Sequence, residues 1–390
     1  MKAHTTIELL YIEAGGGHRA TALALQEVMR EQCRPWQVRR VDLMSLLDPD
    51  ARVQRLTGRP PEHLYNQALA RGRTFGMGAQ LRALQALLAL GHGWLVRRFE
   101  AHWRRTRPAM VVSLVPNFNR AIGKAVERAL PGVPFVTVMT DLADLPPHFW
   151  IEPEVEQQLV CGSERAAAQA LAQGLDPQRI HRTSGMVLHP DFYSPLAIDR
   201  ELERARLGLL PGRPTAVVMF GGQGSDQMLR IERELPELQL VLMCGHNYDL
   251  ARRLKARSAP APRAVIGFTT EVHRHLQLGD LFIGKPGPGC LSEAIRLGLP
   301  VITLRNRHTL PQERYNTEWV LEHGLGRVLR SWSELQPATA RMLQHLADYR
   351  AAVARIDNRA VFELPRLLER LLQSSPTVVA REAVTALSTL

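Results

Sequence analysis

The sequence of 390 residues has few of the features that mark secreted, membrane-spanning or zinc-binding proteins. Its four cysteines, at positions 33, 161, 244 and 290, form no CxxC pair, which argues against a disulfide framework and favours a reducing cytosol. The longest stretch without Asp, Glu, Lys or Arg, residues 83–96, has 14 residues, whereas a membrane-spanning helix needs about 20. We therefore expect no transmembrane helix.

Lysine is also scarce, since four of the 49 basic residues are lysine and the others arginine. The net charge of +11 predicts an anionic partner, which is nucleic acid, a phosphate-bearing ligand or an acidic membrane leaflet. The chain has no basic motif interleaved with aromatic residues, so nucleic acid is not an expected partner. Hydrophobic residues make up 45% and charged residues 22%, as in ordinary folded domains.

Short β-branched runs alternate with longer helical stretches, which is typical of βα units around a largely parallel sheet. Strands are predicted in two series, at 7–12, 38–42, 110–114, 135–139 and 158–161, and then at 215–220, 238–243, 264–266, 281–283 and 301–304. Four prolines within 188–214 predict an interdomain connection between the two series. We predict an α/β protein with Rossmann-like domains over 1–195 and 196–365, and a tail over 366–390 that packs back on the first domain.

A glycine loop with a histidine follows the first predicted strand and comprises Gly15, Gly16, Gly17 and His18. Its glycines let the backbone approach a ligand, and the start of the next predicted helix favours anions. An imidazole of near-neutral pKa at this place can take a proton from an attacking hydroxyl. The alternative is a turn that only connects strand and helix.

Two glycine loops follow strands of the second series. The first holds Gly221, Gly222 and Gln223, and the second is the run GKPGPGCLSEA over 284–294. Ligands of open α/β sheets bind beyond the carboxyl ends of the strands, so glycine loops of both domains point toward one cleft. In the second loop the prolines fix the backbone and the glycines open N–H groups to a diphosphate.

Polar side chains cluster at the starts of two predicted helices. Glu293 can accept two hydrogen bonds from a ribose diol, and Gln312, Glu313 and Asn316 carry groups suited to sugar hydroxyls. The spacing of four places Gln312 and Asn316 on one side of their helix. The alternatives are that Glu293 only complements the helix dipole and that the other three residues only cap a helix.

Together these motifs resemble a known family. The matching segments, in order over roughly 7–330, are GGGHR (15–19), TDL (140–142), CGHN (244–247), GF (267–268), KPGPGCLSEAIRLGLPVI (285–302) and PQERYN (311–316). They look like the family 28-like GT-B glycosyltransferases of the monogalactosyldiacylglycerol synthase and processive diacylglycerol glucosyltransferase type. The resemblance implies two Rossmann-like domains that face a central cleft, with the acceptor on the first and a nucleotide sugar on the second.

The resemblance also implies roles for individual residues. His18 would be the catalytic base, Glu293 would bind the ribose, and Phe268 would flank the base of the nucleotide. Asp141 would orient His18 or line the acceptor site, with a strand-end cap as the alternative. The full set of expected donor-binding residues is Gly221, Gly222, Gln223, Phe268, Lys285, Gly287, Pro288, Gly289, Glu293, Gln312, Glu313 and Asn316.

Such enzymes usually invert configuration without a bound metal, so the expected co-substrate is a UDP-sugar and no cofactor is expected. The run Asp48-Pro49-Asp50 spells the DxD metal motif, but proline at its centre favours a turn. The sequence departs from the family pattern at Val115-Pro116, where a His-Pro pair is usual, at 307–311, and at the bulky Arg314-Tyr315 after Glu313.

One segment is a candidate for membrane association. In 81–103, six apolar residues share one side of a helical projection while arginines point elsewhere, which indicates either an interfacial basic helix or an ordinary core helix. The six residues are Leu81, Leu84, Leu88, Leu95, Phe99 and Trp103. Residues 52–80 would form a flap beside the acceptor site.

We therefore predict a glycosyltransferase that moves a hexose from a UDP-sugar to a lipid hydroxyl, with diacylglycerol as the expected acceptor. It would be cytoplasmic and bound peripherally to the anionic inner face of the cell membrane. Two alternatives keep the donor motifs: a transferase with a soluble small-molecule acceptor, and a UDP-sugar epimerase.

Overall fold

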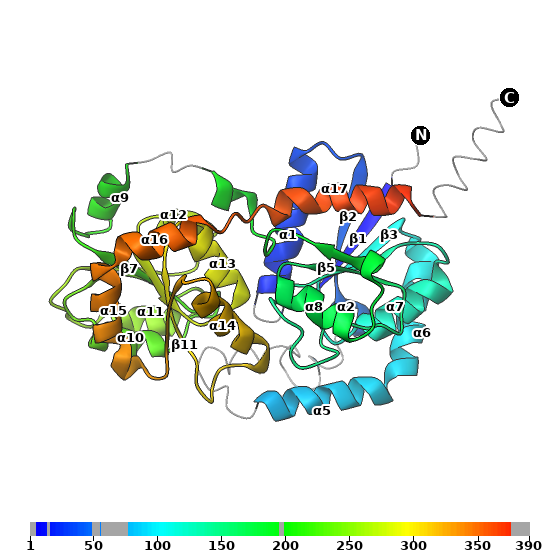
Figure 1. Ribbon diagram of the computed structural model, residues 1–390, viewed down its shortest axis with the longest axis horizontal. Coiled ribbons are helices and arrows are strands. Elements are labelled where there is room, and N and C mark those ends of the chain that lie inside the picture. Colours follow the sequence, from blue (N-terminus) through cyan, green and yellow to red (C-terminus); the bar gives the residue numbers. More distant parts are fainter. Residues whose placement is uncertain (1–4, 14–15, 49–54, 56–76, 195–198, 376–390) are drawn as a thin grey trace.

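The molecule has two lobes, each built around one β-sheet (Figure 1). The computed structural model describes residues 5–13, 16–48, 55, 77–194 and 199–375. We call residues 5–182 the N-terminal lobe and residues 199–356 the C-terminal lobe.

The N-terminal lobe alternates strands and helices along the chain. Its elements are β1 (Thr5–Tyr11), α1 (Gly17–Glu31), β2 (Trp36–Asp42), α2 (Leu43–Leu47), α5 (Met77–Leu90), α6 (His92–Thr106), β3 (Met110–Ser113), α7 (Asn119–Ala129), β4 (Phe135–Val138), β5 (Gln157–Cys161), α8 (Glu164–Ala172), η1 (Pro177–Arg179) and β6 (Ile180–Arg182).

The C-terminal lobe follows the short helix η2 (Pro190–Tyr193) and repeats the alternation. Its elements are α9 (Arg200–Arg206), β7 (Thr215–Met219), α10 (Gln227–Glu234), β8 (Gln239–Met243), α11 (Tyr248–Lys255), β9 (Arg263–Ile266), α12 (Val272–Leu276), β10 (Leu281–Gly284), α13 (Pro288–Arg296), β11 (Val301–Leu304), η3 (Pro311–Glu313), α14 (Arg314–Glu322), β12 (Gly326–Leu329), η4 (Trp332–Glu334), α15 (Leu335–Gln344) and α16 (Leu346–Ala354).

Each sheet has six parallel strands, in the orders β2-β1-β3-β4-β5-β6 and β12-β11-β10-β7-β8-β9. This confirms the predicted α/β class with two parallel sheets. The chain order reverses beside β1 in the first sheet and beside β7 in the second. In open α/β sheets such reversal points open the crevices in which ligands bind, so the loops after β1, β3, β7 and β10 are the places to look for a site.

All ten predicted strands are present, and β6 and β12 were missed. Both are edge strands, with the sequences IHR and GRVL, and each contains an arginine and one β-branched residue. So short a run carries too little alternation to predict a strand from its pattern.

Apolar side chains pack against both faces of each sheet. In the N-terminal lobe one layer includes Leu25 and Met29 of α1, and the other includes Phe99 and Trp103 of α6. Parallel strands covered on both faces are almost wholly apolar, as the four buried residues of β3 show. Each lobe therefore has its own core.

The helix α17 (Ala360–Gln373) crosses back from the C-terminal lobe to pack on α1 (Figure 1). Its Leu364 and Leu368 join the core beside Leu25 and Met29, and Arg34 Nη1 lies 2.6 Å from Glu369 Oε2. Because the helix begins at Ala360, the expected boundary between 365 and 366 falls inside it.

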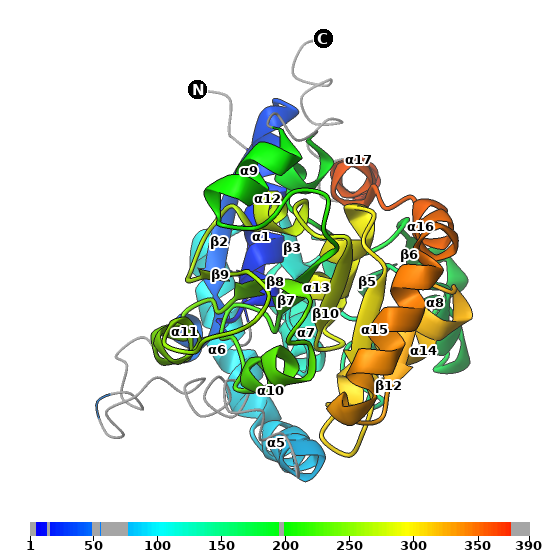
Figure 2. The same cartoon turned by 90° about the vertical axis from the view of Figure 1, so that its left-hand side faces the viewer.

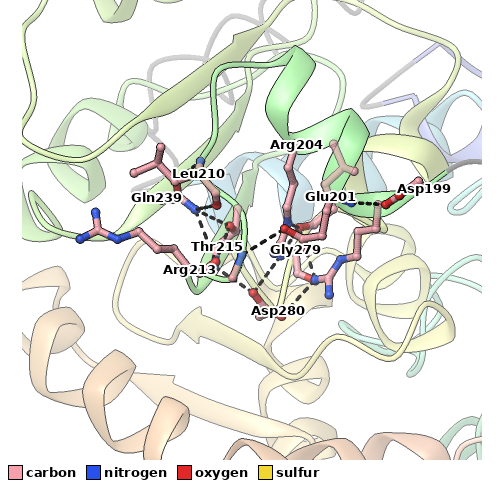
Figure 3. A network of polar contacts seen from close by, with 12 residues as sticks. Asp199, Glu201, Arg204, Leu210, Arg213, Thr215, Gln239, Gly279 and Asp280 are labelled. Carbon is pink, nitrogen blue, oxygen red and sulfur yellow. Dashed lines mark hydrogen bonds and ion pairs between the residues drawn. The ribbon is translucent and has the colours of Figure 1, made fainter.

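A mostly buried carboxylate joins several elements of the C-terminal lobe (Figure 3). Asp280, which precedes β10, accepts hydrogen bonds from Arg200, Arg204 and Arg350 and from the backbone N–H of Thr215. These residues come from α9, α16 and β7, so one side chain joins three elements. Seen from the C-terminal lobe in Figure 2, α9 and α12 lie together at one end, away from α14.

Candidate active site

The loops after β7 and β10 lie side by side at the reversal point of the second sheet. A Cβ atom on Gly221, whose φ is +78°, would lie 3.6 Å from Cε of Lys285. At Gly287 a Cβ atom would lie 2.9 Å from the same Cε, so a side chain there would displace the lysine. No atom lies within 4 Å of such a position at Gly222 or Gly289. The backbone is therefore open on the side where a ligand can approach.

The helix α13 begins directly at this loop, with Gly287 as its N-cap and Pro288 in its first turn. Its free N–H groups, with the positive end of the helix dipole, favour an anion such as a phosphate. The helix is nine residues long, which is enough to supply that dipole. The backbone of this loop is compatible with the predicted phosphate site, which stays a prediction.

The side chains around the loop hold one another in place. Lys285 Nζ lies 3.1 Å from Glu313 Oε1, and both side chains are mostly buried. Asn316, which is fully buried, donates from Nδ2 to the carbonyl of Pro286 over 2.7 Å. Oδ1 of Asn316 and Oε1 of Gln312 are buried without a hydrogen-bond partner, so both can accept from a bound hydroxyl.

Glu293 is half-buried on α13, and burial raises its pKa to about 7. Burial also raises the pKa of the Cys290 thiol to about 12, with Glu293, Lys285 and Glu313 as charged neighbours. Glu293 is therefore close to the loop. Its raised pKa indicates a carboxylate that gains from hydrogen-bond donors when a ligand brings them.

An aromatic pair marks the other end of the donor side. Phe268 is half-exposed, and its ring stacks on His246 with a centroid distance of 3.9 Å and an angle of 19°. The backbone N–H of His246 donates to the carbonyl of Gly222 over 2.8 Å, which ties the pair to the loop after β7. An exposed flat ring in this place offers a surface on which a nucleobase can stack. Gln223 lies half-buried in the same loop.

On the opposite lobe, His18 lies in the first turn of α1, after Gly16 with φ +86° and Gly17. Its Nδ1 is 3.0 Å from Oγ1 of Thr140. Burial lowers the pKa of His18 to about 4, and a hydrogen bond with the backbone of Leu114 opposes that shift. The sequence predicts a near-neutral pKa, and this is wrong because the surrounding protein removes water from the ring and disfavours its charged form.

Asp141 is buried beside His18 but does not bond to it. Its Oδ2 accepts from Nε1 of Trp150 over 3.0 Å, and the ring of Trp150 lies 6.1 Å from that of His18. Burial raises the pKa of Asp141 to about 7, and Glu313 adds to this while Lys285 opposes it. The two charges belong to the C-terminal lobe, so Asp141 faces the donor loop across the gap between the lobes.

The predicted site residues thus form one row. It runs from Phe268 through the glycine loops to Lys285 and Glu313, and then across to Asp141 and His18. Gly15 and the flap predicted over 52–80 fall wholly or mainly outside the described residues, as do Pro49 and Asp50 of the DxD run. No group of three or more His, Cys, Asp or Glu placed to hold a metal occurs in the part of the chain described here.

Three residues of this region were not assigned from the sequence. Trp150 and His246 reach the site through tertiary packing. Of the two, His246 alone lies in a segment that the sequence analysis named, CGHN. Tyr315 was noted as a bulky departure from the family pattern and lies 7% exposed between the lobes, against Leu142 and Met186. Its size serves the contact between lobes, which no spacing in the sequence reveals.

The segment 81–103 breaks at Gly91 into α5 and α6, so the proposed single face does not exist. Leu95, Phe99 and Trp103 lie in the core, which confirms the alternative of a core helix for α6. The large apolar residues of this segment that face solvent are Leu84, which belongs to the predicted face, and Leu87, Leu90 and Trp94, which do not. Among the described helices, none has the length and apolar character needed to cross a bilayer.

Comparison with solved structures defines the class of the fold as GT-B. The spinosyn rhamnosyltransferase SpnG in complex with thymidine diphosphate aligns with a TM-score of 0.60 at 14% identity, over 93% of this chain and 99% of that one. MurG of Acinetobacter baumannii aligns with a TM-score of 0.55 at 13% identity, over 94% and 99%. The UDP-GlcNAc 2-epimerase of Neisseria meningitidis gives 0.54 at 11% identity, over 95% and 100%. The predicted GT-B fold is confirmed, and the fold alone does not separate transferases from epimerases.

Sequence comparison is more specific. The chain is 28% identical over 390 residues to "Monogalactosyldiacylglycerol synthase, chloroplastic" of Spinacia oleracea, covering 94% of this chain and 72% of the relative. Monogalactosyldiacylglycerol synthase 1 of Arabidopsis thaliana is 27% identical over 350 residues, with coverages of 85% and 63%. No protein-family model matches. These similarities confirm the predicted resemblance to monogalactosyldiacylglycerol synthases, although the chain spans less than two thirds of some of these relatives.

Proposed function

We propose that the protein transfers a hexose from a UDP-sugar to the free hydroxyl of diacylglycerol. The observation that carries the proposal is that Asp141 of the N-terminal lobe lies close enough to Glu313 and Lys285 of the C-terminal lobe for their charges to act on its carboxyl group. A donor held on one lobe and an acceptor held on the other would meet there. The similarity to monogalactosyldiacylglycerol synthases along 94% of the chain supports the acceptor and makes UDP-galactose the first donor to test.

The chemistry follows from the charges on each side. The neutral ring of His18 has a lone pair with which it takes the proton from the acceptor hydroxyl as that oxygen attacks the sugar carbon. The bond to the diphosphate breaks on the opposite face, so the configuration inverts. Lys285 and the N-terminus of α13 stabilise the negative charge that develops on the departing UDP.

Glu293 and the residues of η3 and α14 hold the donor. Glu293 accepts hydrogen bonds from the ribose hydroxyls, and the unpaired oxygens of Gln312 and Asn316 accept from hydroxyls of the sugar. Binding energy of this kind positions the sugar carbon for attack. No metal and no cofactor take part in the proposal.

Incubation with a panel of UDP-sugars and diacylglycerol vesicles tests the activity. We expect a glycosyl-diacylglycerol product and release of UDP, identified by mass and by analysis of the released sugar. A product formed only with water-soluble acceptors would replace diacylglycerol as the acceptor. Interconversion of UDP-hexoses without any acceptor would replace the transferase by an epimerase.

Exposed apolar residues at the end of α5 and the start of α6 support a peripheral membrane location, on the anionic inner face of the cell membrane. Leu87, Leu90 and Trp94 are 65%, 86% and 52% exposed. Burial lowers the pKa of His92 beside them; the positive charges of Arg120, Arg128 and Lys124 on α7 add to this, and Glu154 opposes it. Arg120 and Lys124 also pair with Glu154 and Glu127. Apolar side chains flanked by basic ones suit the interface of an anionic leaflet.

Vesicle sedimentation tests this location. The double variant Leu87→Gln, Leu90→Gln should lose binding to vesicles that contain anionic lipid. The matched control is Leu171→Gln, because Leu171 is 52% exposed on α8. Equal binding by both variants would exclude α5 as the membrane face.

A further inference from the structure

Three consecutive residues of the N-terminal lobe contact three different parts of the molecule. Thr140 lies 3.0 Å from His18, and the carboxylate of Asp141 faces the donor loop. Leu142 is 1% exposed and packs against Tyr315 of the C-terminal lobe. The contact between lobes is therefore adjacent in sequence to the acceptor-side polar groups.

In the C-terminal lobe, residues 313–316 likewise combine site residues with a residue of the contact between lobes. Glu313 pairs with Lys285, and Asn316 donates to the backbone of the phosphate loop. Tyr315, between them, belongs to the same apolar cluster as Leu142, and Trp319 packs against that cluster from the same helix. Each half of the site is thus next in sequence to one side of this apolar contact, which is separate from the packing of α17 on α1.

This contact is a compact cluster whose buried members are Leu142, Ala143, Met186 and Tyr315. Tyr315 is held from two directions besides. Its hydroxyl donates to Oε2 of Glu322 over 3.2 Å, and the guanidinium of Arg165 lies 5.7 Å from its ring centroid. Burial and the charge of Glu322 keep this hydroxyl protonated, with the pKa of Tyr315 raised to about 12.

The loop that carries Asp141 and Leu142 is rigid. The carbonyl of Leu142 accepts from the hydroxyl of Ser163, and Gln169 bonds both to the N–H and to the carbonyl of Asp144 at 2.8 and 3.0 Å. Oδ1 of Asp144 accepts in turn from the N–H of Trp150 over 2.6 Å. Since the loop has little freedom to deform, a displacement at Leu142 moves Asp141 with it.

We propose that Tyr315 and Leu142 are positioning residues, which set the placement of His18 and Asp141 relative to Lys285 and Glu313. The inference rests on the proposed transfer reaction and adds to it the device that aligns donor and acceptor. Neither residue contacts a reacting atom. Their loss misaligns the two halves of the site and leaves each half intact.

The experiment compares Tyr315→Ala, Leu142→Ala and the double variant with the unchanged protein. Transfer to diacylglycerol should fall about 10- to 100-fold in kcat for each single variant, because a shift of about 1 Å in the reacting groups has this effect. UDP affinity, measured by calorimetry without acceptor, should stay within about threefold. The double variant should be little worse than either single one, because both remove the same contact.

Two controls separate alignment from general destabilisation. Tyr315→Phe keeps the ring and should retain transfer within about threefold. Tyr349→Ala removes a ring that packs on the core of the C-terminal lobe and should lower Tm without lowering kcat at 25 °C. A normal kcat in Tyr315→Ala would overturn the inference, and so would a loss of UDP affinity as large as the loss of kcat. In either case the proposed function would stand as long as the unchanged protein transfers the sugar. Absence of transfer by the unchanged protein would overturn both.

Discussion

The donor side and the acceptor side of the candidate site are built in different ways. The donor side is drawn mainly from one stretch, 285–316, and is held by an ion pair and by hydrogen bonds to the loop backbone. The acceptor side joins His18, Thr140 and Trp150 from distant parts of the chain. Burial there disfavours charge, lowering the pKa of His18 and raising that of Asp141. One side suits a charged diphosphate, and the other suits a proton transfer from an apolar acceptor.

The largest expected effect is a loss of transfer by a variant on the acceptor side that leaves UDP binding on the donor side unchanged. His18→Ala should lower transfer by about 100- to 10,000-fold, the usual contribution of a general base, and leave UDP affinity unchanged. Product formation and calorimetry with UDP measure the two quantities. The exposed His148 on the same lobe supplies the control His148→Ala. Normal turnover by the His18 variant would remove it as the base.

A variant on the donor side should do the reverse. Glu293→Ala removes hydrogen bonds to a charged acceptor and should weaken donor binding about 10- to 100-fold, while kcat at saturating donor changes little. Glu318→Ala is the matched control, since the side chain of Glu318 is 41% exposed and pairs with Arg305 in a surface contact of 2.8 Å. An unchanged donor affinity would contradict the role of Glu293.

The pH profile of transfer distinguishes the two acceptor-side groups. Lowering the pH protonates Asp141 around its pKa of about 7 and His18 only around about 4. If the Asp141 carboxylate assists proton transfer, kcat should fall below pH 7, and Asp141→Asn should be slower but lose this dependence. Glu293 also has a pKa of about 7, so the variant Glu293→Gln is the control: assayed at saturating donor, its kcat should still fall below pH 7. A kcat that falls only near pH 4 would leave His18 as the sole base.

The smallest effect on transfer is expected far from the cleft. Asp280→Asn leaves three arginines without their shared carboxylate and should lower Tm clearly, without changing UDP affinity. Burial raises the pKa of Asp280, but the backbone N–H of Thr215 and then the arginines outweigh it and hold the pKa below its ordinary value. Its contribution to stability is therefore present above about pH 4 and is lost as the pH falls further. Thermal melts at pH 7 and pH 3 measure this. Equal Tm of both proteins at pH 7 would contradict the structural role.

The difference between the donor side and the acceptor side explains how much of the site could be predicted from the sequence. The strands, the glycine loops and the donor residues follow from local patterns, because backbone conformation and helix caps are decided within a few residues. Trp150, Thr140 and the low pKa of His18 depend on which distant segments meet, and single-sequence patterns hold no record of that. Leu95 and Phe99 show the same limit. Their apolar helix face is compatible with a protein core and with a membrane surface, and only the packing in the structure places it in the core.

The return of α17 to the first lobe has a consequence for how the protein comes to be folded. In synthesis the acceptor lobe precedes the donor lobe, yet Leu25 and Met29 of α1 stay without the apolar side chains of α17 until the donor lobe has been made. The donor lobe can therefore fold before the core of the acceptor lobe is complete. Removal of α17 would expose the core of the acceptor lobe and leave the core of the donor lobe covered.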